Sequence, residues 1–148
     1  MSEPRHVVCP HCTSVNRIPA GKAAGDARCG SCHRTLFDGH PAAVDATQFE
    51  AHRRRNDIAV LVDVWAPWCG PCRAMAPMFE RAAAELEPDV RLIKVNADEQ
   101  PGIASEFGVS GIPALLLLRH GKLVARAAGA MDTRRIVAWT RAQLAQAA

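Results

Sequence analysis

The chain has 148 residues and a formal net charge of +3 at pH 7, and 49% of its residues are hydrophobic. This length suits one ordinary domain, or a small module followed by a domain of about 100 residues. The charge is too small to favour binding to nucleic acid, and no segment reaches the ~18 apolar residues of a membrane span.

Residues 1–8 lack the apolar stretch of a secretory signal, so we expect a cytoplasmic protein. In that reducing compartment paired cysteines are metal ligands or catalysts more often than structural disulfides. Composition divides the chain into two zones, and we expect a metal-binding module over residues 1–40 and a second domain over residues 41–148. The joint falls near Asp38-Gly39-His40-Pro41, a cluster of turn-forming residues.

Four cysteines of the first zone form two pairs with the spacing of a metal site. Cys9 and Cys12 are the first Cys-x-x-Cys pair, and Cys29 and Cys32 follow after sixteen intervening residues. Two such pairs at this interval are typical of a tetrahedral zinc site with four thiolate ligands. Because this zone has little apolar surface, we expect zinc to supply the stability that its core lacks.

Strand-like and helix-like segments alternate through the second zone. We expect strands over residues 42–44, 58–65, 90–95, 114–118 and 123–128, and helices over residues 46–55, 71–86, 101–107 and 133–145. Asp45 and Asp132 are predicted helix caps, and Pro77 should kink its helix. The alternation predicts an α/β core, and His120-Gly121 predicts an antiparallel hairpin near its end.

A run of three arginines and two single arginines are expected to have little structural effect. The run Arg53-Arg54-Arg55 is predicted to be a solvated helix end, where cations suit the negative pole of the helix dipole. Arg73 and Arg91 could shape the charge around the site, but they are interpreted as surface arginines, which usually contribute little.

The sequence Cys69-Gly70-Pro71-Cys72 lies where a predicted strand gives way to a predicted helix. The helix dipole and the unpaired N–H groups of a first turn lower the pKa of a cysteine at that position. Cys69 is therefore predicted to be an exposed nucleophilic thiolate, and Cys72, one turn later, to be more buried. A zinc knuckle is the alternative, but the second zone offers no other cysteine pair.

Two charged residues interrupt predicted buried strands. Asp63 lies between Val62 and Val64, where burying a carboxylate is costly. A general base that takes the proton of Cys72 would justify this cost, although the carboxylate could instead only pair with a buried cation. Lys94 could be that cation, or an ordinary strand lysine. Pro113 stands at the entrance of a strand, where a cis peptide bond is possible.

These residues together resemble the thioredoxin family over about residues 42–148. The resemblance rests on Asp63, Lys94, Gly129 and the segments Trp65-Ala66-Pro67-Trp68-Cys69-Gly70-Pro71-Cys72 and Gly111-Ile112-Pro113. It implies a mixed five-stranded sheet flanked by four helices. It also implies a monomeric protein-disulfide reductase that acts on disulfide-containing client proteins and is recharged by thioredoxin reductase with electrons from NADPH.

The resemblance also implies a role for each residue of the site. Cys69 would attack, Cys72 would resolve the mixed disulfide and form the redox-active disulfide Cys69–Cys72, and Pro113 would be a cis-proline facing the two thiols. Asp63 and Lys94 would be the buried charged pair. An apolar patch that holds the client backbone would comprise Trp68, Gly70, Pro71, Gly111, Ile112, Gly129 and Ala130.

The first zone resembles the N-terminal module of the zinc-carrying thioredoxins, with matching segments Arg17-Ile18-Pro19 and Leu36-Phe37-Asp38-Gly39 near the cysteines. That resemblance implies a structural zinc ion. A rival interpretation is that Cys9-Pro10-His11-Cys12 is itself a redox pair, since it matches the active site of some strongly oxidising relatives, or that the four cysteines form two disulfides. The residues after Cys12 are a poor helix, which argues against the redox pair.

Two other functions remain open. The zinc module could sense oxidants while the second domain is a scaffold for partners, because thiolate ligands lose metal on oxidation. The protein could also form disulfides rather than reduce them. The Gly-Pro dipeptide, which by resemblance accompanies reducing potentials, and the lack of an export signal argue against that oxidase function.

Overall fold

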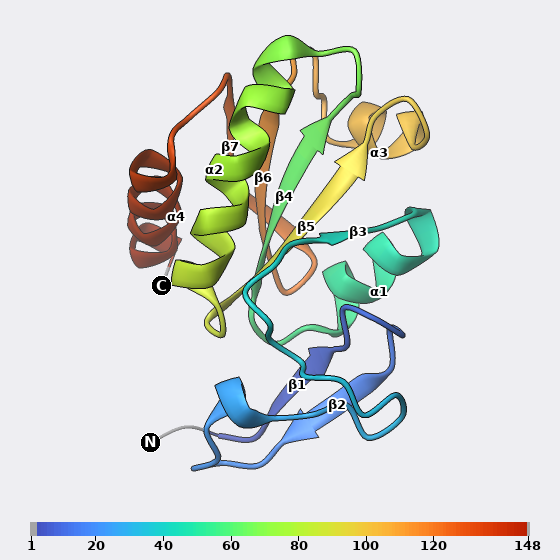
Figure 1. The fold of residues 1–148 in the computed structure, drawn as a ribbon, viewed down its shortest axis with the longest axis vertical. Helices are drawn as coiled ribbons and strands as arrows, with labels where there is room; N and C mark the ends of the chain where they lie inside the picture. The colour runs from blue at the N-terminus through green and yellow to red at the C-terminus, as the bar shows by residue number, and fades with distance from the viewer. Residues whose placement is uncertain (1–2, 148) are drawn as a thin grey trace.

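The computed structural model describes residues 3–147, and the second zone is built on a five-stranded mixed sheet (Figure 1). Across the sheet the strands are β3 (Ala42–Ala43), β5 (Val90–Asn96), β4 (Ala59–Trp65), β6 (Ala114–Arg119) and β7 (Lys122–Ala128). β3, β5 and β4 are parallel, whereas β6 and β7 are antiparallel to their neighbours. The predicted sheet is confirmed, with most strand ends within one residue of the expected positions.

Four helices cover the two faces of this sheet. α2 (Gly70–Leu86) and α4 (Thr133–Ala147) pack on one face, where Met75, Phe79 and Ile136 meet Leu61 and Leu92. α1 (Ala46–Arg55) and α3 (Pro101–Glu106) lie over the other face. This second face is made by the alternate residues of the same strands, as the two-residue period of a strand requires.

Local sequence signals account for where the helices begin. The Asp45 side chain accepts a hydrogen bond from the Gln48 backbone N–H, and the Gln48 side chain accepts one from the Asp45 N–H. This reciprocal pair is a capping box. Asp132 accepts a hydrogen bond from the Arg135 N–H and so caps α4 as expected. Pro77 lies inside α2, which continues through it.

The first zone forms a small folded unit with its own buried cluster, which the sequence did not predict. β1 (Arg5–Val8) and β2 (Val15–Ile18) pair as an antiparallel hairpin, and a short 3-10 turn spans Ala24–Asp26. The cluster also includes one residue of the second zone, Ile58. Its buried members are Val7, Cys9, Ile18, Ala24, Ala27, Cys29, Leu36, Phe37 and Ile58.

Arg91 is not a surface residue but one of the largest fully buried side chains, at 1% exposed. It forms an ion pair of 3.0 Å with Glu87 at the end of α2, and its guanidinium lies 4.5 Å from the centre of the Phe37 ring. It also donates hydrogen bonds to the carbonyl oxygens of Val8 and Leu36. The interpretation of Arg91 as a surface arginine was wrong, because the first zone covers the start of β5.

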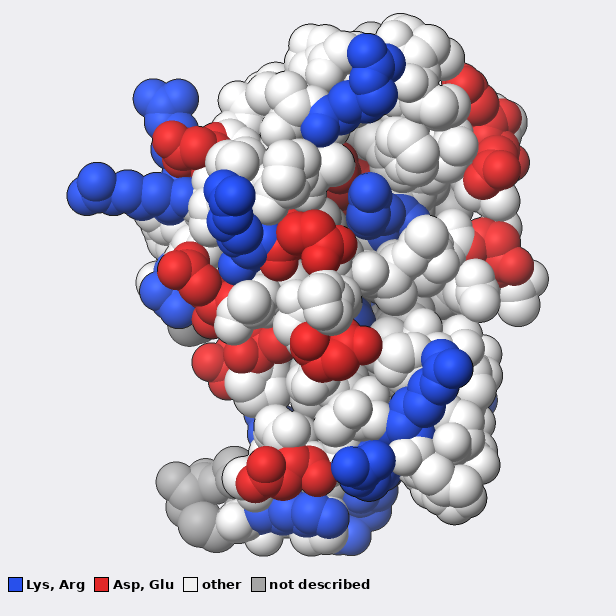
Figure 2. Space-filling view, in the orientation of Figure 1, with Lys and Arg blue, Asp and Glu red and all other residues white. Residues whose placement is uncertain are grey.

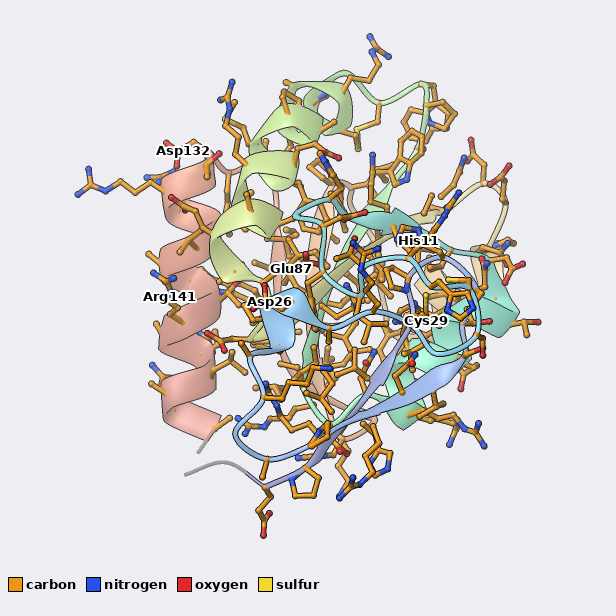
Figure 3. All side chains as sticks on the ribbon, turned by 60° about the horizontal axis from the view of Figure 1, so that its bottom comes forward. His11, Asp26, Cys29, Glu87, Asp132 and Arg141 are labelled. Carbon is orange, nitrogen blue, oxygen red and sulfur yellow. A yellow bond between two sulfur atoms is a disulfide. The ribbon has the colours of Figure 1, made fainter. Side chains whose placement is uncertain are left out.

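A second group of polar contacts holds β1 against α1. The Val8 N–H donates to the Asn56 side chain at 2.8 Å, and the Asp57 carboxylate accepts from the His6 N–H at 2.7 Å. The Gly39 N–H in the joint donates to Glu87 at 2.9 Å. The two zones are therefore joined by buried polar contacts as well as by the chain itself. Figure 3 labels Glu87, at the end of α2.

Arg53 is also less solvated than the sequence suggested. Its side chain is 16% exposed and pairs with Glu106 at 2.6 Å, while Arg54 remains exposed. The Arg53 guanidinium lies 5.0 Å from the centre of the Phe107 ring. Elsewhere, basic and acidic side chains are interspersed on the face shown in Figure 2, in keeping with the small net charge. Within residues 3–147, no helix combines the length and apolar character needed to cross a membrane.

Candidate functional site

Cys69 is the N-cap of α2, directly after the loop that follows β4. The Cys72 backbone N–H points at the Cys69 sulfur at 3.2 Å, and Pro71 occupies the first turn, where a missing N–H costs nothing. The two cysteines are joined as a disulfide, with their Cα atoms 5.2 Å apart. The motif therefore places a sulfur at the positive end of a seventeen-residue helix.

The segment Gly111-Ile112-Pro113 passes beside this disulfide. The Ile112–Pro113 peptide bond is cis, and the Cys69 sulfur lies 3.8 Å from the Ile112 carbonyl oxygen. The Gly129 N–H donates to the Pro113 carbonyl at 2.9 Å, and Gly129 has a φ of +99°, which favours glycine. Three separate segments thus meet at the disulfide.

Exposure differs strongly between the cysteines and the residues around them. Cys69 is 5% and Cys72 is 2% exposed, so the expected contrast between the two is small in this disulfide form. Trp68 is 68% exposed and its indole N–H donates to the Asp98 carboxylate at 3.0 Å. The sequence analysis missed Asp98, whose only signal is its place just after β5. The remaining patch residues Gly70, Pro71, Gly111, Gly129 and Ala130 are exposed, and Ile112 is half-buried.

Asp63 lies on β4 on the same face as Ala59 and Leu61, which is the face covered by α2. It is 0% exposed, and neither carboxylate oxygen has a hydrogen-bond partner among the described residues. Burial raises its pKa to about 7, and the charge of Lys94 opposes that rise. A carboxyl group with this pKa can accept or return a proton near neutral pH.

Lys94 lies directly opposite Asp63 in the register between β4 and β5. Its ammonium group lies 4.9 Å from the centre of the Trp65 ring. The lysine is half-buried, and no salt bridge within residues 3–147 includes it. It acts on Asp63 through charge at a distance rather than as a hydrogen-bonded partner.

The four cysteines of the first zone converge on one point. Their sulfur atoms all lie within 4.8 Å of one another, with 3.7 Å between Cys9 and Cys32 and 3.5 Å between Cys12 and Cys29. Four sulfurs at the Zn–S bond length on a tetrahedron are about 3.8 Å apart. The donor set and its spacing therefore fit a zinc ion. Cys29 lies on the side of the first zone away from Asp26 (Figure 3).

The two cysteine pairs have the same local geometry, which the sequence spacing alone does not reveal. The Thr13 N–H donates to the Cys9 carbonyl, and the His33 N–H donates to the Cys29 carbonyl. Thr13 and His33 have φ values of +63° and +67°. These turns direct backbone N–H groups at the sulfurs, as from Ser31 and Cys32 to the Cys29 sulfur.

These N–H groups stabilise a thiolate in the first zone. The hydrogen bond from the Cys32 backbone, more than any other contact, lowers the pKa of Cys29 to about 5. The Asn16 side chain, which sequence analysis did not single out, also donates to the Cys29 sulfur at 3.5 Å. Such outer partners orient the ligands of a metal site.

This geometry, a cysteine disulfide at a helix N-terminus beside a cis-proline on a mixed five-stranded sheet, defines a thiol-disulfide oxidoreductase. The family model described as Thioredoxin matches residues 40–142, and the model described as Thioredoxin 2, N-terminal matches residues 8–34. The chain belongs to the thioredoxin family.

Individual relatives agree with both matches. Thioredoxin C-3 of Corynebacterium nephridii is 36% identical over 140 residues, covering 95% of this chain and 96% of the relative. Thioredoxin 1 of Synechococcus elongatus is 42% identical over 90 residues, covering 61% of this chain and 84% of the relative. A solved mutant thioredoxin from Halobacterium salinarum NRC-1 superposes with a TM-score of 0.64 at 31% identity, covering 71% of this chain and 91% of that one.

Proposed function

We propose that this protein reduces disulfides in client proteins, with Cys69 as the attacking residue and Cys72 as the resolving residue. The observation that carries the proposal is the Cys69 sulfur at the start of α2, with the Cys72 N–H 3.2 Å away. In the reduced protein that position favours the Cys69 thiolate.

The reaction transfers two electrons in two exchanges. The Cys69 thiolate attacks one sulfur of a client disulfide, forms a mixed disulfide and releases the other client sulfur as a thiolate. Cys72 then gives up its proton and attacks the Cys69 sulfur. This step forms the Cys69–Cys72 disulfide and frees the second client thiolate. Asp63 takes the proton of Cys72, with Lys94 keeping the pKa of Asp63 from rising further.

The client backbone lies across the exposed patch formed by Trp68, Gly70, Pro71, Gly111, Ile112, Gly129 and Ala130. Pro113 shapes this surface by turning the Ile112 carbonyl toward Cys69. A thioredoxin reductase then returns the disulfide to two thiols with electrons from NADPH. We propose that this cycle runs in the cytoplasm, in a monomer.

An insulin-reduction assay tests the assignment of the two cysteines. Cys69→Ser is expected to abolish turnover, and Cys72→Ser is expected to form a client mixed disulfide through Cys69 that resists release. Ala138→Ser, at an exposed position of α4, is the control for general effects of a substitution. Normal turnover by Cys69→Ser would exclude the proposal.

We further propose that residues 1–40 form a zinc module in which Cys9, Cys12, Cys29 and Cys32 hold a structural ion, ahead of a thioredoxin domain over residues 41–148. Sulfur spacings of 3.5 and 3.7 Å support tetrahedral coordination. Metal analysis of protein purified without oxygen is expected to give one zinc per chain and two reactive thiols in the reduced protein. Chelation should raise the thiol count to six.

A redox-responsive zinc module is the second candidate function. It is favoured because Cys12 is exposed and Cys32 is half-buried, so that an oxidant can reach them. Peroxide would oxidise ligand thiolates to disulfides and release the metal. Reductase activity and partner affinity are compared between two forms of the protein. One form is loaded with zinc, and the other has been treated with peroxide and has had its Cys69–Cys72 pair reduced again. Equal reductase activity and equal partner affinity in the two forms would contradict a regulatory role.

A further inference from the structure

A hollow of about 260 Å³ lies beside the client-binding patch, between the segment after α3 and the ends of β6 and β7. One wall is the loop of residues 108–111, and the floor comes from paired residues of the two strands, Leu116 with Arg126 and Ala114 with Ala128. The lining residues are Gly108, Val109, Ser110, Gly111, Ala114, Leu116, Arg126, Ala127 and Ala128.

The hollow is close to the reacting sulfur along the client path. Its wall ends at Gly111, and the next residue, Ile112, has its carbonyl oxygen 3.8 Å from the Cys69 sulfur. An extended chain advances about 3.3 Å per residue. A client strand lying along residues 110–112 therefore brings a side chain two to four residues from its cysteine into the hollow.

Arg126 gives this hollow its charge. Its Nη1 atom donates to the Phe107 carbonyl at 2.7 Å, while the side chain as a whole is exposed. Gly108 has a φ of +64°, and a Cβ at that position would be only 3.0 Å from Arg126 Nη1. Glycine at 108 thus leaves room for the guanidinium to lie against the loop. Among the residues that the structure describes, one hydrogen bond fixes the group, and its other donors have no acceptor.

The neighbouring Arg53, unlike Arg126, has its charge paired with carboxylates. Arg53 has carboxylate partners in Glu50 and Glu106 at 3.3 and 2.6 Å. Within residues 3–147, no carboxylate lies within ion-pair distance of Arg126. Ser110, which is exposed at the wall of the hollow, adds a hydroxyl that can donate to the same acceptor.

We propose that this hollow is a client subsite that selects an Asp or Glu side chain two to four residues from the attacked cysteine, with Arg126 as the specificity-determining residue. A planar carboxylate matches the fork of a guanidinium better than a neutral amide does. The inference rests on the proposed reductase function and adds a substrate preference to it. Because the contact is partly solvated, it changes the rate by a modest factor.

Peptide disulfides test the preference directly. The probes are synthetic peptides with one intramolecular disulfide, in which the residue two, three or four positions from either cysteine is Glu, Gln or Lys. Reduced protein is mixed with each peptide, and the second-order rate constant is measured from the appearance of peptide thiols. We expect Glu to exceed Gln by about twofold to fivefold at one of these positions, and Lys to be slower than Gln.

The ratio of the Glu rate constant to the Gln rate constant separates a lost contact from a general loss of activity. Arg126→Gln should bring this ratio to one, Arg126→Glu should invert it, and Arg126→Lys should retain part of it. Ser110→Glu places a carboxylate in the hollow without changing Arg126, and it should also reduce the ratio. Arg119→Glu is the matched control, because it makes the same charge change at an exposed site on β6 outside the hollow.

Two results overturn the inference in distinguishable ways. If wild type reduces insulin but shows the same rate with Glu, Gln and Lys at every position, the subsite is wrong and the reductase function stands. The same conclusion follows if Arg126→Glu and its control Arg119→Glu leave the ratio equally unchanged. If wild type reduces neither insulin nor any peptide, the proposed function fails and the subsite fails with it.

Discussion

At the scale of single residues, Asp63 is a fully buried carboxyl group whose oxygens have no hydrogen-bond partner among the described residues. Its pKa in the folded protein is about 7, above the unfolded value of 3.8. Because the folded pKa is above the unfolded pKa, the stability that this proton contributes is fully present below about pH 4. It is lost as the pH rises through 7. The buried carboxylate therefore lowers the stability of the protein at neutral pH in return for a group that can accept a proton beside α2.

Asp63→Asn is expected to raise the free energy of unfolding of the disulfide form by about 2–4 kcal/mol at pH 8 and to change it little at pH 4. The reason is that an amide has no charge to desolvate. Urea denaturation at a series of pH values measures the effect, with exposed Asp89→Asn as the control. The same variant should slow insulin reduction. A stability gain that is equal at both pH values would contradict the assigned pKa.

His52 has the opposite dependence on pH. It is 0% exposed, and burial, with the nearby charge of Arg91, lowers its pKa to about 3. Since the unfolded chain takes up this proton near pH 6.5, the stability that the neutral ring allows is lost as the pH falls from 6.5 through 3. Between about pH 4 and 6.5, His52 makes the stability rise with pH, whereas Asp63 makes it fall.

His52→Gln should therefore remove the loss of stability that this histidine contributes in acid, while the opposite contribution of Asp63 remains. The variant is expected to be less stable than wild type near neutral pH, because the His52 ring packs in the core, and this difference should shrink as the pH falls to 4, since only wild type loses stability through His52. Thermal unfolding between pH 4 and 7 measures this slope. His120→Asn, a change at an exposed histidine of the β6–β7 turn where asparagine tolerates the positive φ, is the control for the loss of an imidazole. A variant curve parallel to that of wild type would show that His52 does not titrate between the two states.

At the scale of elements, periodicity located the longer strands and helices of the second zone, because most of them bury a regular face. The strand pattern at residues 58–65 became β4 at Ala59–Trp65, and the helix pattern at residues 133–145 became α4 at Thr133–Ala147. Periodicity failed in the first zone, where β1 and β2 are four residues each and their pairing follows the cysteine turns. Such short strands have too few alternating residues to be recognised.

Arg53 connects three elements, which its place in a basic run concealed. From the last turn of α1 it reaches Glu106 in α3 and the Gly121 carbonyl in the β6–β7 turn. Arg53→Ala is expected to cost about 1–2 kcal/mol of unfolding free energy, from a charge-assisted hydrogen bond and a cation–π contact. Arg54→Ala, its exposed neighbour, should cost about 0.5 kcal/mol or less. If urea denaturation shows the same loss of unfolding free energy for both variants, Arg53 contributes no more than a solvated arginine.

At the scale of the whole molecule, the sequence predicted the dithiol and the four-cysteine cluster but not how the two zones are joined. Motif spacing is local, so it identifies Cys69-Gly70-Pro71-Cys72 without any knowledge of the fold. The two carbonyl partners of Arg91 are 55 and 83 residues away along the chain, and no pattern within β5 indicates them. Asp98 and Arg126 escaped notice for the same reason, since their roles come from neighbours on other elements.

The buried contacts of Arg91 predict that the two zones unfold together. All three tryptophans, Trp65, Trp68 and Trp139, are in the second zone, whereas the metal cysteines are in the first. Tryptophan fluorescence and zinc release, followed with a chromogenic chelator during urea denaturation, therefore report on different zones. In the wild type we expect coincident transitions. Removal of zinc should then lower the midpoint seen by tryptophan as well, because metal that binds only the folded state stabilises everything that unfolds with it.

Arg91→Met should separate the two transitions. The substitution leaves the Glu87 carboxylate buried without its cation, which costs about 3–5 kcal/mol, and removes the hydrogen bonds to Val8 and Leu36. Zinc release should then come at lower urea than the tryptophan transition, and chelation should no longer shift the latter. Arg73→Met, an exposed arginine of α2, is the matched control. If zinc release in the wild type already precedes the tryptophan transition by a wide margin, Arg91 does not couple the zinc module to the thioredoxin domain.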